Sequence, residues 1–204
     1  FQTKGQLQGS LQPGRAVWDY RDFTGTVGQS DLHGNLRFVS GAPRGKISGS
    51  VTSRQLRLAD LGPVLGTATT TSAKAGRGGK VLPDAPFATD RWNAMDMDLK
   101  FAGQRVVRQG SLPLEDLSVH ALLSDAVLRL DPLHFGVAKG KIESKVVLDS
   151  RNTPLTVHMD TRVQNLRLAS LFPEVELTKK SLGRLDGAMA LNGKGTSVAQ
   201  WLGT

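Results

Sequence analysis

Met95-Asp96-Met97-Asp98-Leu99-Lys100-Phe101 alternates apolar and polar side chains without a break. Successive side chains of a β-strand point to opposite sides, so this period of two predicts a strand with one apolar side and one hydrated side. The run Leu155-Thr156-Val157-His158-Met159-Asp160 repeats the pattern. Further alternations occur at Leu36/Phe38, Leu56/Leu58, Leu117/Val119/Ala121, Leu128/Leu130, Leu133/Phe135/Val137 and Leu185/Met189/Leu191. Together they predict a mainly β protein.

Turn-forming residues separate these alternating runs. Gly25, Gly34, Gly103 and Gly140 punctuate the pattern, and Pro132, which cannot donate to a ladder, marks a bend or a strand start. We therefore expect a meander of antiparallel strands with one apolar face. Evidence for helices is limited to one or two short ones. The candidates are residues 61–65 and 171–175, and a turn capped by Ser197 over residues 198–202.

Composition excludes several classes of protein. The 204 residues contain no Cys, which rules out disulfides, thiolate metal centres and cysteine nucleophiles. The formal net charge is +8, but Lys and Arg are dispersed and aromatic residues make up only 5%, so we predict no nucleic-acid partner. No apolar run is long enough for a membrane helix, and no signal peptide is visible. Because the chain opens at Phe1, we interpret it as one segment excised from a longer protein.

One stretch differs in composition from the rest. Residues 67–80 contain no large apolar side chain, so we expect a flexible loop within a single continuous sheet. A weak internal repeat also stands out: residues 55–63 match residues 165–173 at six of nine positions. In both copies an alternating Leu-Arg-Leu leads to Asp60 or Ser170, which predicts a strand followed by a short capped helix. A recurring unit of this kind suggests an elongated architecture.

A search for chemistry finds no catalytic constellation. The histidines His33, His120, His134 and His158 are isolated, so no metal site is indicated. No phosphate-binding loop or nucleophile elbow has the required spacing. Asp96 and Asp98 share one side of a strand, which is the only hint of a catalytic pair, and they are better explained as the hydrated side of that strand. We expect no enzymatic activity, no metal and no cofactor.

The apolar strand face itself remains as the candidate site. It is either a closed core or an open trough for apolar ligands, and the flexible side chain of Met suits partners of variable shape. The residues predicted to line it are Met95, Met97, Leu99, Phe101, Leu128, Leu130, Phe135, Val157 and Met159.

Several runs resemble the bacterial AsmA family, and together they cover most of the chain. They are residues 30–36, 45–51, 56–61, 82–87, 91–96 and 125–133 with Gly140, and the Gly-rich stretch 183–197. The resemblance implies an elongated, curved sheet that forms an open β-groove, similar to that of the chorein-type bridge proteins. It implies no catalytic residues.

The resemblance also implies a location and a role. A family member is expected in the periplasm of a Gram-negative bacterium, held to the inner membrane by an anchor outside this segment. The expected function is to bind or conduct phospholipids between the inner and outer membranes. The alternative is a scaffold that supports outer-membrane protein assembly and envelope integrity, with outer-membrane components as partners. A third possibility is an enzyme acting on envelope polysaccharide, for which Asp96 and Asp98 would be the carboxylate pair.

Overall fold

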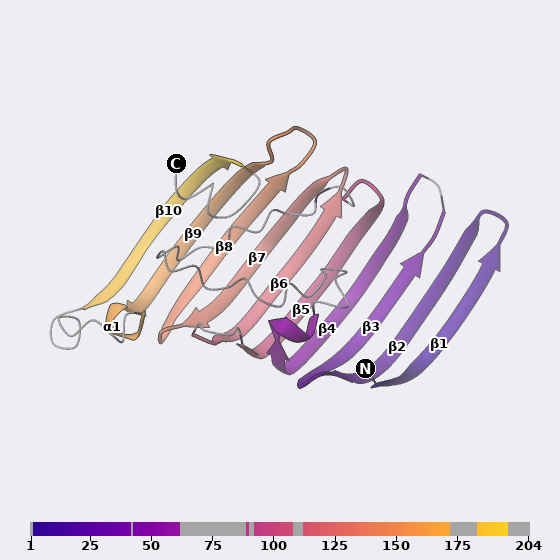
Figure 1. The fold of residues 1–204 in the computed structure, drawn as a ribbon, viewed down its shortest axis with the longest axis horizontal. Helices are drawn as coiled ribbons and strands as arrows, with labels where there is room; N and C mark the ends of the chain where they lie inside the picture. The colour runs from indigo at the N-terminus through magenta and orange to yellow at the C-terminus, as the bar shows by residue number, and fades with distance from the viewer. Residues whose placement is uncertain are drawn as a thin grey trace.

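A computed structural model describes residues 2–41, 43–61, 89, 92–107, 112–171 and 183–195. Ten strands form one sheet, and their order in the sheet is their order along the chain (Figure 1). The elements are β1 (Gln2–Gln12), β2 (Arg15–Val27), β3 (Ser30–Val39), β4 (Gly45–Arg57), η1 (Leu58–Leu61), β5 (Met95–Val107), β6 (Leu114–Ser124), β7 (Val127–Val137), β8 (Gly140–Asp149), β9 (Thr156–Arg167), α1 (Leu168–Leu171) and β10 (Arg184–Lys194).

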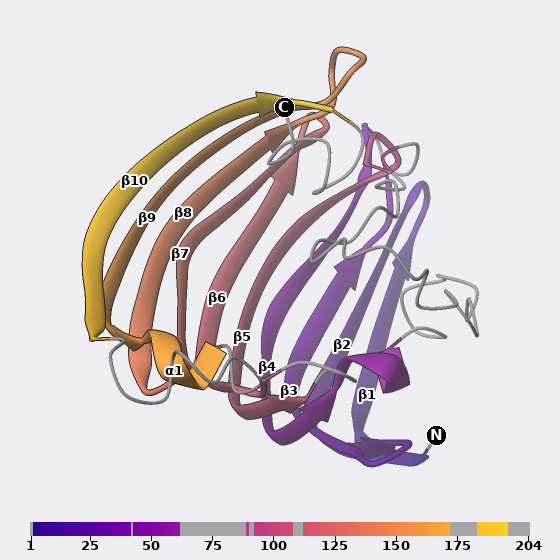
Figure 2. The same ribbon diagram turned by 60° about the vertical axis from the view of Figure 1, so that its left-hand side comes forward.

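The mainly β prediction is confirmed, and the sheet is open. β1 and β10 lie at opposite edges and do not pair with each other. The strands are bowed along their length, so the sheet is curved (Figure 2). Contacts between the described elements run mainly between sheet neighbours, and no described element forms a second layer over either face.

The prediction of a purely antiparallel sheet is wrong at one place. β4 and β5 pair in parallel, with Ile47 opposite Met97 and Val51 opposite Phe101. A parallel pair requires the chain to leave the first strand at one end of the strands and to return to the opposite end before it enters the next strand. Local alternation carries no information about strand direction, so the sequence pattern did not reveal this connection.

Bulges interrupt several of the ladders. The register shifts between Lys4 and Gln6 on β1, between Tyr20 and Phe23 on β2, and between Leu185 and Gly187 on β10. A bulge bends its strand and increases the local twist, so these shifts contribute to the curvature. Pro132 lies at another shift, inside β7 rather than at its start.

Three glycines expected in turns lie inside strands: Gly25 in β2, Gly34 in β3 and Gly103 in β5. At Gly34 the physical reason is close packing of the backbone. Its φ is +154°, and a Cβ there would lie 2.0 Å from the carbonyl oxygen of Ser50. Only glycine fits such an approach, so this residue permits strand pairing instead of ending a strand.

The internal repeat extends well beyond the nine residues that first suggested it. β3 and β8 cover residues 30–39 and 140–149, an offset of 110 that also relates most of β4 to β9. Backbone contacts recur at the same offset. The N–H of Ser40 donates to the carbonyl of Ala16 at 2.8 Å, and the N–H of Ser150 donates to that of Ala126 at 3.0 Å. We call β1–β4 with η1 the first unit and β6–β9 with α1 the second unit.

Both units end in a strand followed by a short helix, as the repeat predicts, but the capping prediction is wrong for Asp60. That residue lies inside η1, and its carboxylate accepts hydrogen bonds from Gln29 N at 2.9 Å and Ser30 Oγ at 2.7 Å. Asp60 therefore ties η1 to the β2–β3 turn. Ser170 likewise lies within α1.

The two helices begin earlier than the windows 61–65 and 171–175 predict, and the remainder of both windows lies outside the described residues. The same is true of the loop predicted at residues 67–80 and of the helix predicted at residues 198–202.

Candidate functional site

The register of the strands places all nine predicted lining residues on one face of the sheet. Paired residues of neighbouring strands point to the same side, as do residues two apart on one strand. Met97 pairs with Ile47 on β4 and with Leu123 on β6, and this row continues through Leu128 to Val157. The remaining predicted residues follow from their pairing partners or from their spacing along these strands.

Two rows on this face cross all ten strands without a charged side chain. The first row contains Gly9, Trp18, Phe38, Ile47, Met97, Leu123, Leu128, Leu148, Val157 and Gly193. The second contains Leu7, Tyr20, Leu36, Gly49, Leu99, Ala121, Leu130, Val146, Met159 and Leu191. We call the side that carries both rows the apolar face.

The N-terminal part of the apolar face escaped the sequence prediction. The alternation at Leu36 and Phe38 predicts a strand, but the predicted lining residues include neither of them. Trp18 and Tyr20 also alternate, and the bulge between Tyr20 and Phe23 breaks the pattern after them. Joining Trp18 and Tyr20 to the Leu36/Phe38 strand would have required knowledge of the strand order.

Aromatic rings lie across glycines in this N-terminal part. A Cβ added to Gly9 would lie 2.6 Å from the ring of Trp18, and one added to Gly5 would lie 2.7 Å from the ring of Tyr20. Tyr20 also stacks on Phe23, with ring centroids 5.2 Å apart. Because the rings of Trp18 and Tyr20 occupy the space that a neighbouring Cβ would fill, they make a low, continuous apolar surface.

Part of the apolar face is covered by the chain's own side chains. Val146, Leu148, Leu155 and Val157 form a buried cluster. Trp92, which lies in the turn before β5 and belongs to no strand, packs against that cluster. The predicted residues Leu128, Leu130 and Met159 pack around the same cluster. The second unit therefore carries a small hydrophobic core.

The opposite face is polar, and several of its charges form ion pairs. Asp98 accepts a hydrogen bond from His120 at 2.9 Å, which is the main reason that its pKa is lowered, and Lys46 lies 3.7 Å away. Asp96 is 3.3 Å from Arg44, which also binds Asp125 in the β6–β7 turn. The two carboxylates proposed as a catalytic pair thus each form ion pairs across strands.

The histidines occupy similar positions on or near the polar side. His33 contacts Asp31 at 3.1 Å. His158 contacts Asn192 at 2.6 Å and Asp160 at 3.1 Å, and its pKa is raised, chiefly by the Asn192 hydrogen bond. Within the described part of the chain, no group of three or more His, Asp or Glu side chains has the geometry of a metal site.

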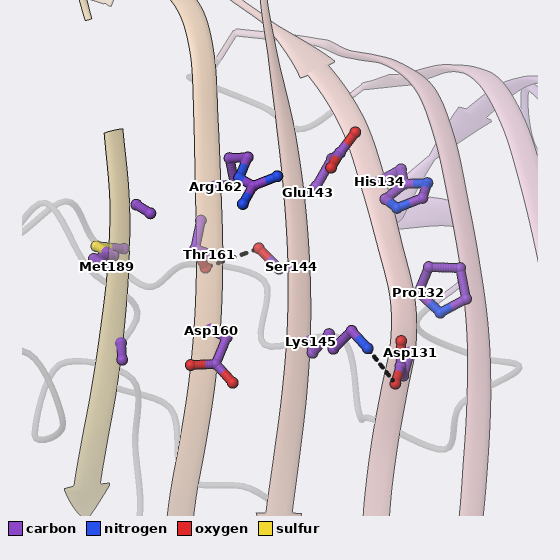
Figure 3. Close-up of a pocket in the computed structure, with 12 residues that line it drawn as sticks. Asp131, Pro132, His134, Glu143, Ser144, Lys145, Asp160, Thr161, Arg162 and Met189 are labelled. Atoms are coloured by element: carbon purple, nitrogen blue, oxygen red, sulfur yellow. Dashed lines mark hydrogen bonds and ion pairs between the residues drawn. The ribbon is translucent and has the colours of Figure 1, made fainter. Parts of the chain in front are cut away.

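A shallow hollow of about 470 Å³ lies over β7–β10 (Figure 3). Side chains of the polar face line it, including His134, Glu143 and Arg162, which come from three adjacent strands. Lys145 and Asp131 form an ion pair at 3.4 Å within it. The lining is charged with both signs, so this hollow does not suit an apolar chain.

Comparison with known proteins assigns the family. The AsmA family model matches residues 1–204. The chain belongs to the AsmA family. It is 42% identical to the AsmA family protein YhjG of Escherichia coli (strain K12), over all of this chain and 32% of that protein. The chain thus spans about a third of the length of this relative.

AsmA family proteins are bacterial proteins associated with the cell envelope, so the comparisons point to an envelope-related function. No solved structure matches the chain. Among the described residues, no helix combines the length and the apolar character needed to cross a membrane.

Proposed function

We propose that the apolar face binds the acyl chains of phospholipids and conducts them between the inner and outer membranes, without a catalytic step. The observation that carries the proposal is the continuity of this face. Two rows of uncharged side chains run across all ten strands, and no described element forms a second layer over them. Soluble proteins rarely expose a large continuous apolar surface to water. Where such a surface occurs, it usually marks a binding site.

The energetics suit this role. Exposing acyl methylenes to water costs about 0.8 kcal/mol each, so hiding a dozen gains on the order of 10 kcal/mol. A flexible chain needs a continuous apolar surface more than a shaped pocket with precisely placed polar groups. The row from Gly9 to Gly193 supplies such a surface and requires no cofactor.

We infer that the apolar face is the concave face of the curved sheet. On β7 the side chains of Leu128, Leu130 and Leu133 are half-buried, whereas Arg129 and His134 on the other side are exposed. Side chains crowd together on the inside of a curve and spread apart on the outside, which supports this assignment. The concave side would then form the groove in which a lipid lies.

The proposal includes a place in the cell. Family membership supports a periplasmic position in a Gram-negative bacterium, with an inner-membrane anchor supplied by other parts of the protein. The headgroup would remain in water at the mouth of the groove, and only the acyl chains would contact the apolar face.

Lipid extraction tests the proposal directly. The protein is purified in detergent-free buffer, extracted with organic solvent and examined by mass spectrometry for phospholipid. We expect co-purified phospholipid with the native chain, much less with Met97→Glu on the apolar face, and an unchanged amount with Lys100→Glu on the other side of the same strand. Absence of phospholipid from the native chain would overturn the proposal.

The covered second unit favours one alternative. Because Trp92 packs on the apolar face of the second unit, that part of the sheet behaves as a core. A protein whose whole apolar face is a core would serve as a scaffold for outer-membrane protein assembly. Under this alternative Met97→Glu would unfold the protein, whereas an open groove would keep its fold and lose its lipid.

A further inference from the structure

The two units place equivalent residues on the apolar face, but these residues differ in how far they are exposed. At the offset of 110, Trp18 corresponds to Leu128, Phe38 to Leu148 and Ile47 to Val157. The pairing confirms the correspondence. Phe38 pairs with Trp18 and Ile47, and Leu148 pairs with Leu128 and Val157. The apolar faces of the two units can therefore be compared residue by residue.

The equivalent side chains of the two units differ in their exposure to solvent. Phe38 is 37% exposed, whereas Leu148 in the equivalent position is only 5% exposed. Trp18 is 39% exposed, and Leu128 is half-buried beside the buried cluster. The same backbone frame therefore presents an open apolar surface in the first unit and a covered one in the second.

Trp92 is the described side chain that covers the second unit from outside the sheet. It packs against the cluster of Val146, Leu148, Leu155 and Val157. The ring is apolar, uncharged and not part of any strand. It shows what chemistry the apolar face accepts there: a bulky, largely apolar ring packed against side chains of β8 and β9.

We propose that Trp92 occupies an acyl-chain site on the second unit, and that phospholipid therefore binds first on the first unit, over Trp18 and Phe38. This inference rests on the proposed function and adds a regulation to it. A lipid that advances along the groove must displace Trp92, because ring and acyl chain contact the same side chains. Trp92 thus sets where lipids enter and how many the segment holds.

Tryptophan fluorescence can locate the lipid, because the chain has only three Trp residues, at positions 18, 92 and 201. The double variant Trp92→Phe/Trp201→Phe reports from the first unit, and Trp18→Phe/Trp201→Phe reports from the second with its ring in place. The probe is a vesicle of phosphatidylglycerol and phosphatidylethanolamine with brominated acyl chains, which quench Trp on contact. We expect strong quenching of Trp18 and little quenching of Trp92 at low lipid-to-protein ratios.

A second measurement counts the bound lipids. Trp92→Ala should raise the phospholipid retained per protein about twofold, because two equivalent repeat units become available in place of one. Leu122→Ala, on the polar face, is the matched control and should retain the native amount. Circular dichroism confirms that each variant keeps its strand content.

The outcomes separate the inference from the function on which it rests. Equal quenching of Trp18 and Trp92 at every ratio, or unchanged lipid retention in a folded Trp92→Ala, would overturn the inference and leave the proposed function standing. Absence of quenching at both positions, together with no retained lipid, would overturn both.

Discussion

The first and second units share strand bounds and backbone contacts but differ in what they place on the apolar face. The first unit carries rings and glycines, such as Trp18 and Phe38 with Gly34 and Gly49. The second carries aliphatic side chains at the corresponding positions, and Trp92 packs over them. The frame is therefore set by pairing and turns, whereas the side chains on the apolar face decide whether that face is open or becomes a core.

The largest expected difference concerns a charge introduced on the apolar face of each unit. Leu148→Glu would bury an unpaired carboxylate under Trp92 and should destabilise the protein by about 4 kcal/mol or more. Phe38→Glu, at the equivalent exposed position, should cost about 1 kcal/mol. Urea unfolding of both variants measures the gap. Equal losses would mean that the first unit is covered as well.

Close backbone packing gives the next largest effect. Gly34→Ala would place a Cβ against the Ser50 carbonyl at a φ that L residues avoid, and should cost about 3 kcal/mol. Its counterpart in the second unit is Ser144, which hydrogen-bonds to Thr161 at 2.9 Å. Ser144→Ala should cost only about 1 kcal/mol. Thermal unfolding of the two variants checks the ranking, and a native-like Gly34→Ala would contradict the tight approach.

Asp31 distinguishes the units by a polar contact. Its carboxylate accepts hydrogen bonds from the N–H groups of Arg54, at 3.1 Å, and Gln55, at 2.8 Å, where the β4 ladder is interrupted. The corresponding residue of the second unit is Lys141. Asp31→Asn should destabilise the protein by about 2 kcal/mol, because charge-assisted bonds are lost. Lys141→Gln is the control and should have little effect in the same unfolding assay.

The same carboxylate predicts a pH dependence. Burial raises the pKa of Asp31, but hydrogen bonds from Gln55, Arg54 and His33 lower it by more, so the net shift is well below the ordinary value. A lowered folded-state pKa contributes stability above the unfolded pKa of about 4, and that stability is lost as the pH falls through the folded pKa. The difference in unfolding free energy between native protein and Asp31→Asn should be smaller at about pH 3 than at about pH 7, because the unfolded-state carboxyl group is largely protonated at the lower pH. A constant gap between them would be inconsistent with this shift.

The smallest expected effect lies outside the apolar face. Lys145→Ala removes the exposed ion pair with Asp131 in the hollow of the second unit and should cost about 0.5 kcal/mol or less. Lipid retention should not change, because the hollow lies on the polar face. A marked loss of bound lipid would indicate that lipid binds the polar face, which would contradict the proposed function.

The strands and the side on which their apolar residues lie could be predicted from the sequence, because strand alternation is a local signal. The run from Met95 to Phe101 identified both the strand and its apolar side, and the nine lining residues do share one face. The parallel β4–β5 pair could not be predicted, because strand direction depends on where the connection runs. Gly34 and Gly103 lie inside strands and not in the predicted turns, because a glycine that admits a neighbouring backbone or ring looks the same in sequence as a glycine that ends a strand.

The covering of the second unit was also beyond the sequence. Trp92 lies shortly before a strand, and nothing in its local pattern indicates that it packs against the buried cluster of β8 and β9, which follow much later in the chain. The aromatic part of the apolar face was missed for a related reason. The bulge after Tyr20 shifts the alternation, so the side on which Phe23 lies depends on the register.

Photo-crosslinking decides which face meets lipid. Benzoylphenylalanine is placed at Phe38 or Met97 on the apolar face, and at Arg37 or Lys100 on the polar face of the same strands, and the protein is irradiated with phospholipid vesicles. We predict lipid adducts at Phe38 and Met97 and none above background at Arg37 and Lys100. Adducts of equal yield on both faces, or adducts confined to Arg37 and Lys100, would contradict an apolar groove for acyl chains.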